Sequence, residues 1–296
     1  MISLAATSDV VHAINGARNI ALCAYALGSG RMRRTLEAAA KSGAKVEVRL
    51  EGRPYGDVAG RLARANREVI ARLRQAGADA RLVDRDGKRP WHMKAAVVDG
   101  VAYLDDRNWP TSEDNTIVRD DDPHDVNVVR AALEGYARAD RALATNKGNA
   151  LRLEAGVLKR ALQTRTATCV ESESFTAGTA TYKTIKALAR AGVPVRLLVA
   201  QQDLKPATRG ALAALQRAGV AVRRSGDSEK LAIGTSQAWV GSANASYGNA
   251  DQIDWGLRVT SRVMVADLRA RFESNWAHAK PLAAREVRTV PGRSHR

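Results

Sequence analysis

One seventeen-residue pattern occurs twice in this chain, and its repetition restricts the fold more than any other feature. The first copy spans residues 92–108 and the second spans residues 228–244. In each copy four residues separate a lysine from the next motif position, which is Asp99 after Lys94 and Thr235 after Lys230. Five more residues then precede the tetrapeptide at 105–108 or at 241–244. The copies align without a gap, so the sequence predicts a duplicated unit.

The apolar pattern before each copy predicts the same order of elements, strand, helix, strand, helix, strand. In the first half the strands are expected at 19–27, 45–50 and 80–83 and the helices at 31–42 and 59–75; in the second half the strands are expected at 167–175, 195–199 and 220–223 and the helices at 181–191 and 207–218. Strands that alternate with helices are typical of a mostly parallel sheet covered by helices. We therefore expect an α/β fold of two similar halves, packed pseudo-symmetrically.

The boundary between the halves is expected at the Gly/Asn turn of residues 146–149, between two helices at 128–145 and 151–164. This gives an N-terminal repeat over 1–147 and a C-terminal repeat over 148–296. Because each half already provides a docking surface for the other, we expect a monomer with internal pseudo-symmetry.

Charge restricts the class of partner. The 296-residue chain has a formal net charge of +16, of which +4 falls in residues 1–150 and +12 in residues 151–296. Such a field attracts polyanions, either nucleic acid or an anionic membrane surface. No apolar run is long enough to span a bilayer and no signal peptide is evident, so a cytoplasmic location is the default. The two cysteines are expected to be buried thiols.

The first copy carries the chemistry. Asp99-Gly100 favours a two-residue hairpin turn, which makes the flanking apolar segments two strands. Side chains two apart on a strand share a face, so His92 and Lys94 are expected to lie side by side. An imidazole next to a fixed cation suits reactions at an anionic, phosphate-like centre.

This pattern resembles the motif of the phospholipase D superfamily, which is His-x-Lys, four residues, Asp, then Gly-Ser-x-Asn, usually once in each of two halves. The first half matches at His92, Lys94, Asp99 and Asn108, but has Asp105-Asp106 in place of Gly-Ser. The second half matches at Lys230, Gly241, Ser242 and Asn244, but has Ser228 in place of His and Thr235 in place of Asp.

The resemblance implies a two-step phosphoryl transfer through a phosphohistidine, with no metal and no cofactor. His92 is the available nucleophile. The nonbridging phosphate oxygens would be bound by Lys94, Asn108, Lys230, Ser242 and Asn244.

Two further roles need side chains outside the motif. A carboxylate should orient the nucleophilic imidazole. The resemblance implies an acidic residue shortly after the motif asparagine, at the entry to a further strand, and by this placement Asp125, which precedes Val126, is the expected partner of His92. Asp254 has a similar position, but its own histidine is missing, so it is expected to cap a strand. The proton for the leaving group, which the second histidine would supply, could come from Asp106 or His124.

A metal site is the alternative for the acidic residues. Their carboxylates could bind Mg²⁺ or Ca²⁺. The residues are Asp105, Asp106, Asp120, Asp121, Asp122 and Asp125. Their spacing matches no calcium loop, so we expect a solvated loop at 119–124 and no metal.

Three functions remain open. The first is a metal-independent phosphodiesterase that acts on nucleic acid. The second is a hydrolase or phosphatidyltransferase that acts on phospholipid. The third is a degenerate member that binds polyanions without turnover, which the loss of one histidine favours.

Overall fold

The computed structural model describes residues 1–27, 30–55, 57–83, 91–109, 115–200, 206–226 and 229–282. The chain forms two compact units. The first contains Met1–Leu153 together with Val240–Ala243 and Gly248–Arg258. The second contains Glu154–Trp239, Asn244–Tyr247 and Val259–Arg296. The first unit therefore takes two segments from far along the chain.

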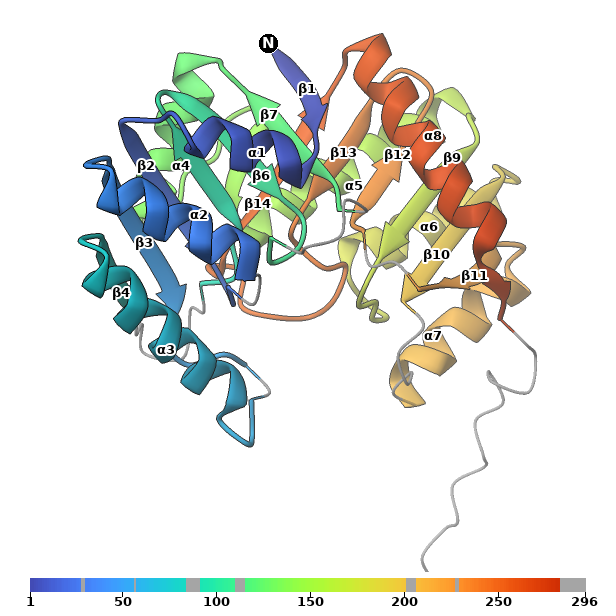
Figure 1. Ribbon diagram of the computed structural model, residues 1–296. Coiled ribbons are helices and arrows are strands. Elements are labelled where there is room, and N and C mark those ends of the chain that lie inside the picture. The colour runs from blue at the N-terminus through green and yellow to red at the C-terminus, as the bar shows by residue number, and fades with distance from the viewer. Residues whose placement is uncertain are drawn as a thin grey trace, which may run out of the picture. The chain divides into compact units, whose positions relative to one another are not determined.

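The first unit contains a seven-stranded sheet with the order β1-β7-β6-β5-β2-β3-β4 (Figure 1). Its strands are β1 (Ile2–Ala5), β2 (Asn19–Ala24), β3 (Lys45–Glu51), β4 (Asp79–Val83), β5 (Ala95–Val98), β6 (Val101–Asp105) and β7 (Ile117–Asp120). β2, β3 and β4 are parallel, whereas β5, β6, β7 and β1 add antiparallel. The sheet is thus mixed, because hairpins rather than helical crossovers connect β5, β6 and β7.

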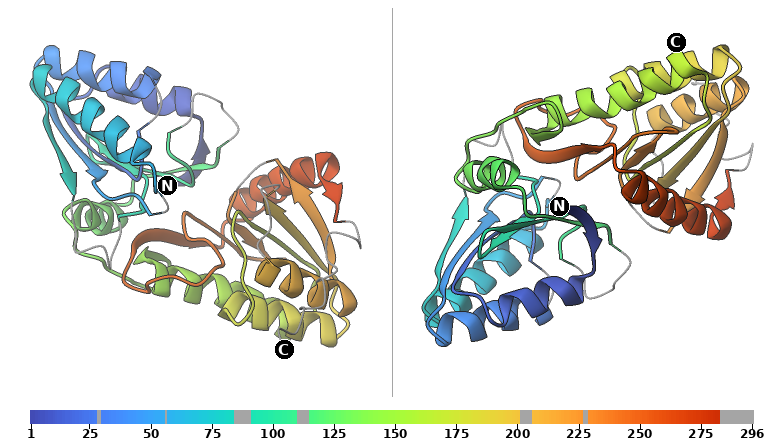
Figure 2. Two further views of the ribbon diagram at one scale, coloured as in Figure 1. Left: turned by 90° about the horizontal axis from the view of Figure 1, so that it is seen from below. Right: turned by 90° about the horizontal axis from the view of Figure 1, so that it is seen from above.

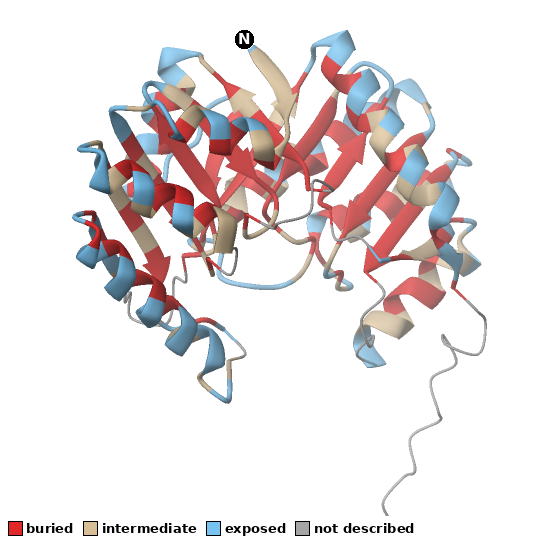
Figure 3. Cartoon of the chain, in the orientation of Figure 1, coloured by how far each residue is buried: buried red, intermediate tan, exposed pale blue. Residues whose placement is uncertain are grey.

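Four helices belong to the first unit up to residue 146. They are α1 (Thr7–Ile14), α2 (Gly30–Lys41), α3 (Arg61–Gln75) and α4 (Pro123–Leu133). The inner face of α2 places Met32, Leu36 and Ala39 in the core at a helical spacing. Figure 3 shows this alternation of buried and exposed positions along the helices.

A second sheet has the order β15-β11-β10-β9-β12-β13-β14-β8. Its strands are β8 (Leu143–Asn146), β9 (Thr168–Ser172), β10 (Val195–Ala200), β11 (Ala221–Ser225), β12 (Leu231–Ile233), β13 (Ala238–Gly241), β14 (Ile253–Val259) and β15 (Lys280–Pro281). The helices of this part are α5 (Lys147–Thr164), α6 (Ala180–Arg190), α7 (Pro206–Arg217) and α8 (Arg262–His278). The two further views in Figure 2 show α6 and α7 beside the strands of the second unit.

The predicted order of elements is confirmed in both halves, and both sheets have flanking helices as expected. One connection differs. The segment 128–145, expected as a single helix, is the end of α4 followed by β8. The helix starts further upstream than expected, where Asp122 caps α4 and Pro123 is its first residue, and it ends before Gly135, which has a φ angle of 94°.

The predicted turn at Asp99-Gly100 is confirmed. Val98 pairs with Val101, and Asp99 and Gly100 have φ angles of 43° and 86°. The Asp99 carboxylate accepts hydrogen bonds from the backbone N–H groups of Arg18 and Asn19, at 3.0 and 2.8 Å. These contacts fasten the turn to the start of β2.

Both cysteines are buried free thiols, as expected. Burial raises the pKa of the Cys23 thiol to about 12, so it is not a nucleophile. Within the described ranges, no helix combines the length and the apolar character needed to cross a bilayer.

Candidate functional site

One strand, β14, fixes His92 in two ways. The backbone N–H of His92 donates to the carbonyl of Ile253 at 2.9 Å. The next residue of β14, Asp254, places its Oδ1 3.1 Å from Nδ1 of the imidazole. Because an ionised carboxylate only accepts hydrogen bonds, Nδ1 of the imidazole donates to Asp254. The His92 side chain is 21% exposed, so a substrate can reach the ring.

Lys94 lies beside this imidazole as expected, although both residues lie directly before β5 and not within the strand. Its Nζ is 3.0 Å from Nδ1 and 3.2 Å from Nε2 of His92. The lysine side chain is almost completely buried, and its ammonium also lies 5.7 Å from the centre of the Tyr25 ring. A buried cation within hydrogen-bond distance of both ring nitrogens is an arrangement that attracts an anionic oxygen.

Asp254 is a buried carboxylate that remains ionised. Burial alone would raise its pKa, but the charges of His92 and Lys94 and a hydrogen bond from Ser242 outweigh this and lower the pKa to about 2. The Gln252 amide donates to its second oxygen at 2.8 Å. The carboxylate is therefore held by neighbours on both sides, and it can stabilise a positive charge on the imidazole.

Ser242, expected to bind phosphate, uses its hydroxyl elsewhere in this structure. The hydroxyl donates to Asp254 Oδ1 and accepts from the backbone N–H of Trp255 at 3.0 Å. Its donor is thus committed to the carboxylate. The contacts make Ser242 a positioning residue for Asp254.

Two residues of this site carry no motif signal. The Tyr25 ring lies 5.1 Å from the His92 ring, centre to centre, and its hydroxyl donates to the Tyr55 carbonyl at 2.9 Å. Lys147, the first residue of α5, is 6% exposed, and its Nζ lies close to the Gly248 backbone. Burial lowers the pKa of Lys147, while the charge of Asp254 opposes this shift. A buried second lysine thus interacts electrostatically with the carboxylate.

The expected contact between Asp125 and His92 is wrong, since Asp254 occupies that place. Asp125 lies in the first turn of α4, where partial burial and the carboxylates of Asp120, Asp140 and Asp122 raise its pKa to about 7. His124 is 71% exposed and its Nε2 lies 3.0 Å from Asp140.

The remaining first-half motif residues stabilise a turn. Asp105 accepts from the Trp109 backbone at 2.6 Å and from the Asn115 amide at 2.7 Å. Burial raises its pKa to about 6. Asp106 is also buried and accepts from the Thr116 backbone at 3.0 Å, and Asn108 accepts from the Ala26 backbone at 3.2 Å. These bonds satisfy backbone groups of the loop after β6.

The second-half motif gathers around a carboxylate. Lys230 Nζ lies 3.3 Å from Glu173 Oε2, and the Asn244 amide donates to the same oxygen at 3.3 Å. The Asn244 carbonyl oxygen accepts from the Ser174 backbone at 3.2 Å. Glu173 therefore occupies the position expected for an anion between the lysine and the asparagine. Ser228 lies outside the described residues.

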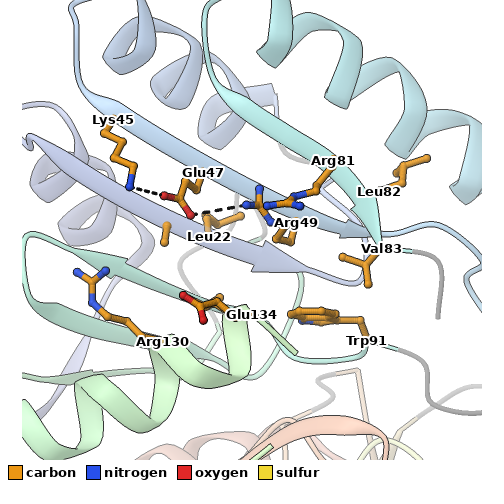
Figure 4. Close-up of a pocket in the computed structure, with 12 residues that line it drawn as sticks. Leu22, Lys45, Glu47, Arg49, Arg81, Leu82, Val83, Trp91, Arg130 and Glu134 are labelled. Atoms are coloured by element: carbon orange, nitrogen blue, oxygen red, sulfur yellow. Dashed lines mark ion pairs between the residues drawn. The ribbon is translucent and has the colours of Figure 1, made fainter. Parts of the chain in front are cut away.

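A cavity of about 450 Å³ lies elsewhere in the first unit, between α4 and the strands β2, β3 and β4 (Figure 4). Three of its charged side chains contact one another, since Lys45 and Arg49 lie 2.8 and 3.6 Å from Glu47. His92 does not line this cavity, so we do not assign the reaction to it.

Comparison with known proteins adds information on the fold. The sequence matches no protein-family model and no curated protein. Among solved structures, polyphosphate kinase from Porphyromonas gingivalis is similar over 94% of this chain and 47% of its own, at 17% identity and a TM-score of 0.69. The chain thus spans about half the length of that protein.

Phosphatidylserine synthase from Haemophilus influenzae Rd KW20 is similar over 95% of this chain and 87% of its own, at 11% identity and a TM-score of 0.63. Nuc from Salmonella typhimurium, described as a phospholipase D family member, is similar over 48% of this chain and 99% of its own, at 16% identity and a TM-score of 0.43.

Proposed function

We propose that this chain, which has the phospholipase D fold, is a metal-independent phosphodiesterase with His92 as its nucleophile. The carrying observation is the arrangement of the His92 imidazole between a buried carboxylate at 3.1 Å and a buried ammonium at 3.2 Å. A nucleophile, its orienting group and a charge stabiliser are the parts that covalent catalysis requires.

In the first step, Nε2 attacks phosphorus and the bond from phosphorus to the leaving oxygen breaks. The imidazole becomes positively charged, and Asp254 stabilises this charge through the Nδ1 proton. Lys94 binds a nonbridging oxygen and offsets its negative charge. The leaving oxygen takes a proton from a general acid.

In the second step, water attacks the phosphohistidine, the bond between Nε2 and phosphorus breaks, and the water loses a proton. Lys147 fits both proton transfers, because its lowered pKa lets it give up a proton more readily than an exposed lysine does. We propose it in the role that a second histidine would have. Asp106 and His124 fit this role less well, since each is engaged as described above.

The choice of nucleic acid as substrate rests on charge. The chain carries +16 overall, and phosphate contacts by lysine and arginine dominate the affinity for nucleic acid. A phospholipid substrate is the alternative, and the fold likeness to an enzyme named phosphatidylserine synthase favours it. A polyanion-binding protein without turnover is the third candidate, favoured by Glu173 between Lys230 and Asn244.

The test is hydrolysis of bis(p-nitrophenyl) phosphate, single- and double-stranded DNA, RNA and phospholipid vesicles, each with EDTA present. The proposal expects cleavage of nucleic acid, loss of cleavage in His92→Ala, and full retention in His12→Ala, a histidine on α1. Acid quenching should trap labelled phosphate on wild type and not on His92→Ala. Phosphatidic acid as the product would favour a phospholipid substrate. Salt-sensitive binding of polyanions without any product would favour a binding protein without turnover.

A further inference from the structure

A cluster that shares no residue with the His92 site lies at the beginning of α4. The Asp122 side chain accepts from the His124 backbone at 2.8 Å and caps the helix, which places His124 and Asp125 in its first turn. One ligand atom each from His124, Asp125 and Asp140 lie within 4.8 Å of one another. Three such atoms at that separation can bind one ion.

Asp140 is oriented for such a role by its own hydrogen bonds. Its Oδ1 accepts from the backbone N–H groups of Ala142 and Leu143, both at 2.7 Å. This leaves Oδ2 directed at His124, where it lies 3.0 Å from Nε2. Hydrogen bonds of this kind to a ligand carboxylate fix its direction.

A second, independent observation comes from Asp120, the last residue of β7. It is completely buried, and Oδ1 accepts from the Asp122 backbone at 3.0 Å. Its Oδ2 has no hydrogen-bond donor among the described residues, and its carboxyl group lies next to that of Asp125, whose pKa it raises. Two carboxylates that meet without a donor need either a proton or a cation between them.

We propose that Asp125, Asp140 and His124 bind a divalent transition-metal ion, with Asp120 as the buried charge behind Asp125. One imidazole nitrogen with carboxylate oxygens suits Zn²⁺ or Mn²⁺ better than Mg²⁺ or Ca²⁺, which prefer oxygen ligands only. The ion would join the first turn of α4 to the segment before β8. Its role is therefore to stabilise the first unit, and the reaction at His92 does not use it.

The test is calorimetric titration of Zn²⁺, and then Mn²⁺, into the full chain after chelator treatment and dialysis. We expect one saturable site, weakened at least tenfold by His124→Ala and by Asp140→Asn. The asparagine keeps the oxygen that accepts from Ala142 and Leu143, and His124 is exposed, so both variants should fold. His12→Ala, which removes a histidine from a different helix, should bind as wild type does.

Thermal unfolding gives a readout that is independent of activity. Zn²⁺ should raise the melting temperature of wild type and of His12→Ala, and should leave that of His124→Ala unchanged. Absence of saturable binding below about 100 μM, or equal binding by His124→Ala and wild type, would overturn the proposal. A melting temperature that changes with pH but not with added metal would also overturn it, because Asp120 and Asp125 would then share only a proton. Loss of this site would leave EDTA-resistant cleavage at His92 unaffected, so the two proposals fail separately.

Discussion

Asp254 lies 3.1 Å from His92 although 162 residues separate them in the chain. The nucleophile of the first sequence repeat is thus oriented by a carboxylate of the second. The backbone of Ser242 pairs with Trp255, and that of the equivalent Asp106 pairs with Thr116, so Asn115 holds the position in the first repeat that is equivalent to Asp254. The carboxylate is replaced there by an amide, which donates to Asp105 at 2.7 Å.

Replacing Asp254 by Asn should lower kcat by roughly 10³–10⁴-fold, the cost of a comparable change in a catalytic triad. An amide cannot stabilise the imidazolium, and it can bind the wrong tautomer of the ring. Steady-state kinetics on bis(p-nitrophenyl) phosphate measures the effect. Asp125→Asn is the matched control, with kcat near the wild-type value. Equal losses in both variants would contradict the assignment.

Lys147 should determine the alkaline limb of the pH–rate profile. A general acid is active while protonated, so the rate falls as pH rises through its pKa, which burial lowers. Lys147→Arg keeps the charge but cannot release a proton. We expect it to lower kcat by about 10²-fold and to remove that limb, whereas Lys147→Met should also raise KM. A profile that keeps its shape in Lys147→Arg would exclude the lysine as the acid.

Glu173→Gln should strengthen binding of polyanions. The carboxylate contacts both Lys230 and Asn244, and its neutralisation frees their charge and donor for phosphate. We expect several-fold tighter binding of single-stranded DNA at fixed salt, measured by fluorescence anisotropy. Glu68→Gln on α3 makes the same charge change at an exposed position and serves as the control. If both variants bind single-stranded DNA more tightly by the same factor, the change in net charge alone is responsible.

Glu154 should make the protein less stable as pH rises. It is buried and accepts a hydrogen bond from the Thr181 hydroxyl at 2.6 Å, and burial raises its pKa from 4.5 to about 8. Between these values the unfolded chain loses the proton and the folded chain keeps it, so stability falls by about 1.4 kcal/mol per pH unit. Above pH 8 the effect levels off.

Glu154→Gln cannot ionise and keeps an oxygen that accepts from Thr181. From pH 5 to pH 8, the free energy of unfolding of wild type in urea should therefore fall by a few kcal/mol relative to that of the variant. If the free energies of unfolding of the two proteins depend on pH in the same way, Glu154 is ionised in the folded state.

Local geometry explains what the sequence predicted. His92 and Lys94 lie close together as expected, although both precede β5 and are not part of the strand, and the turn follows from Asp99-Gly100. The partner of His92 could not be found in this way. Asp125 is the expected partner because the resemblance implies an acidic residue shortly after the motif asparagine, at the entry to a strand, yet the Asp122-Pro123 pair upstream is a helix start. A spacing argument that treats each repeat alone cannot find an exchange between repeats.

Lys147 illustrates a second limit. Nothing near it in the sequence sets it apart from the other lysines, and its lowered pKa arises from burial beside segments that lie about 100 residues further along the chain. Burial of that kind depends on tertiary structure. The cluster of His124 with Asp140 is similar, since sixteen residues separate the two.

The membership of β14 in the first unit also affects the order of events during synthesis. The imidazole leaves the ribosome early, whereas its carboxylate is not made until residue 254 has been translated. A stalled or prematurely terminated product would thus contain the nucleophile without the group that sets its tautomer. The reactive centre would therefore be complete only after β14 has been translated, and products that end before this strand would remain inert.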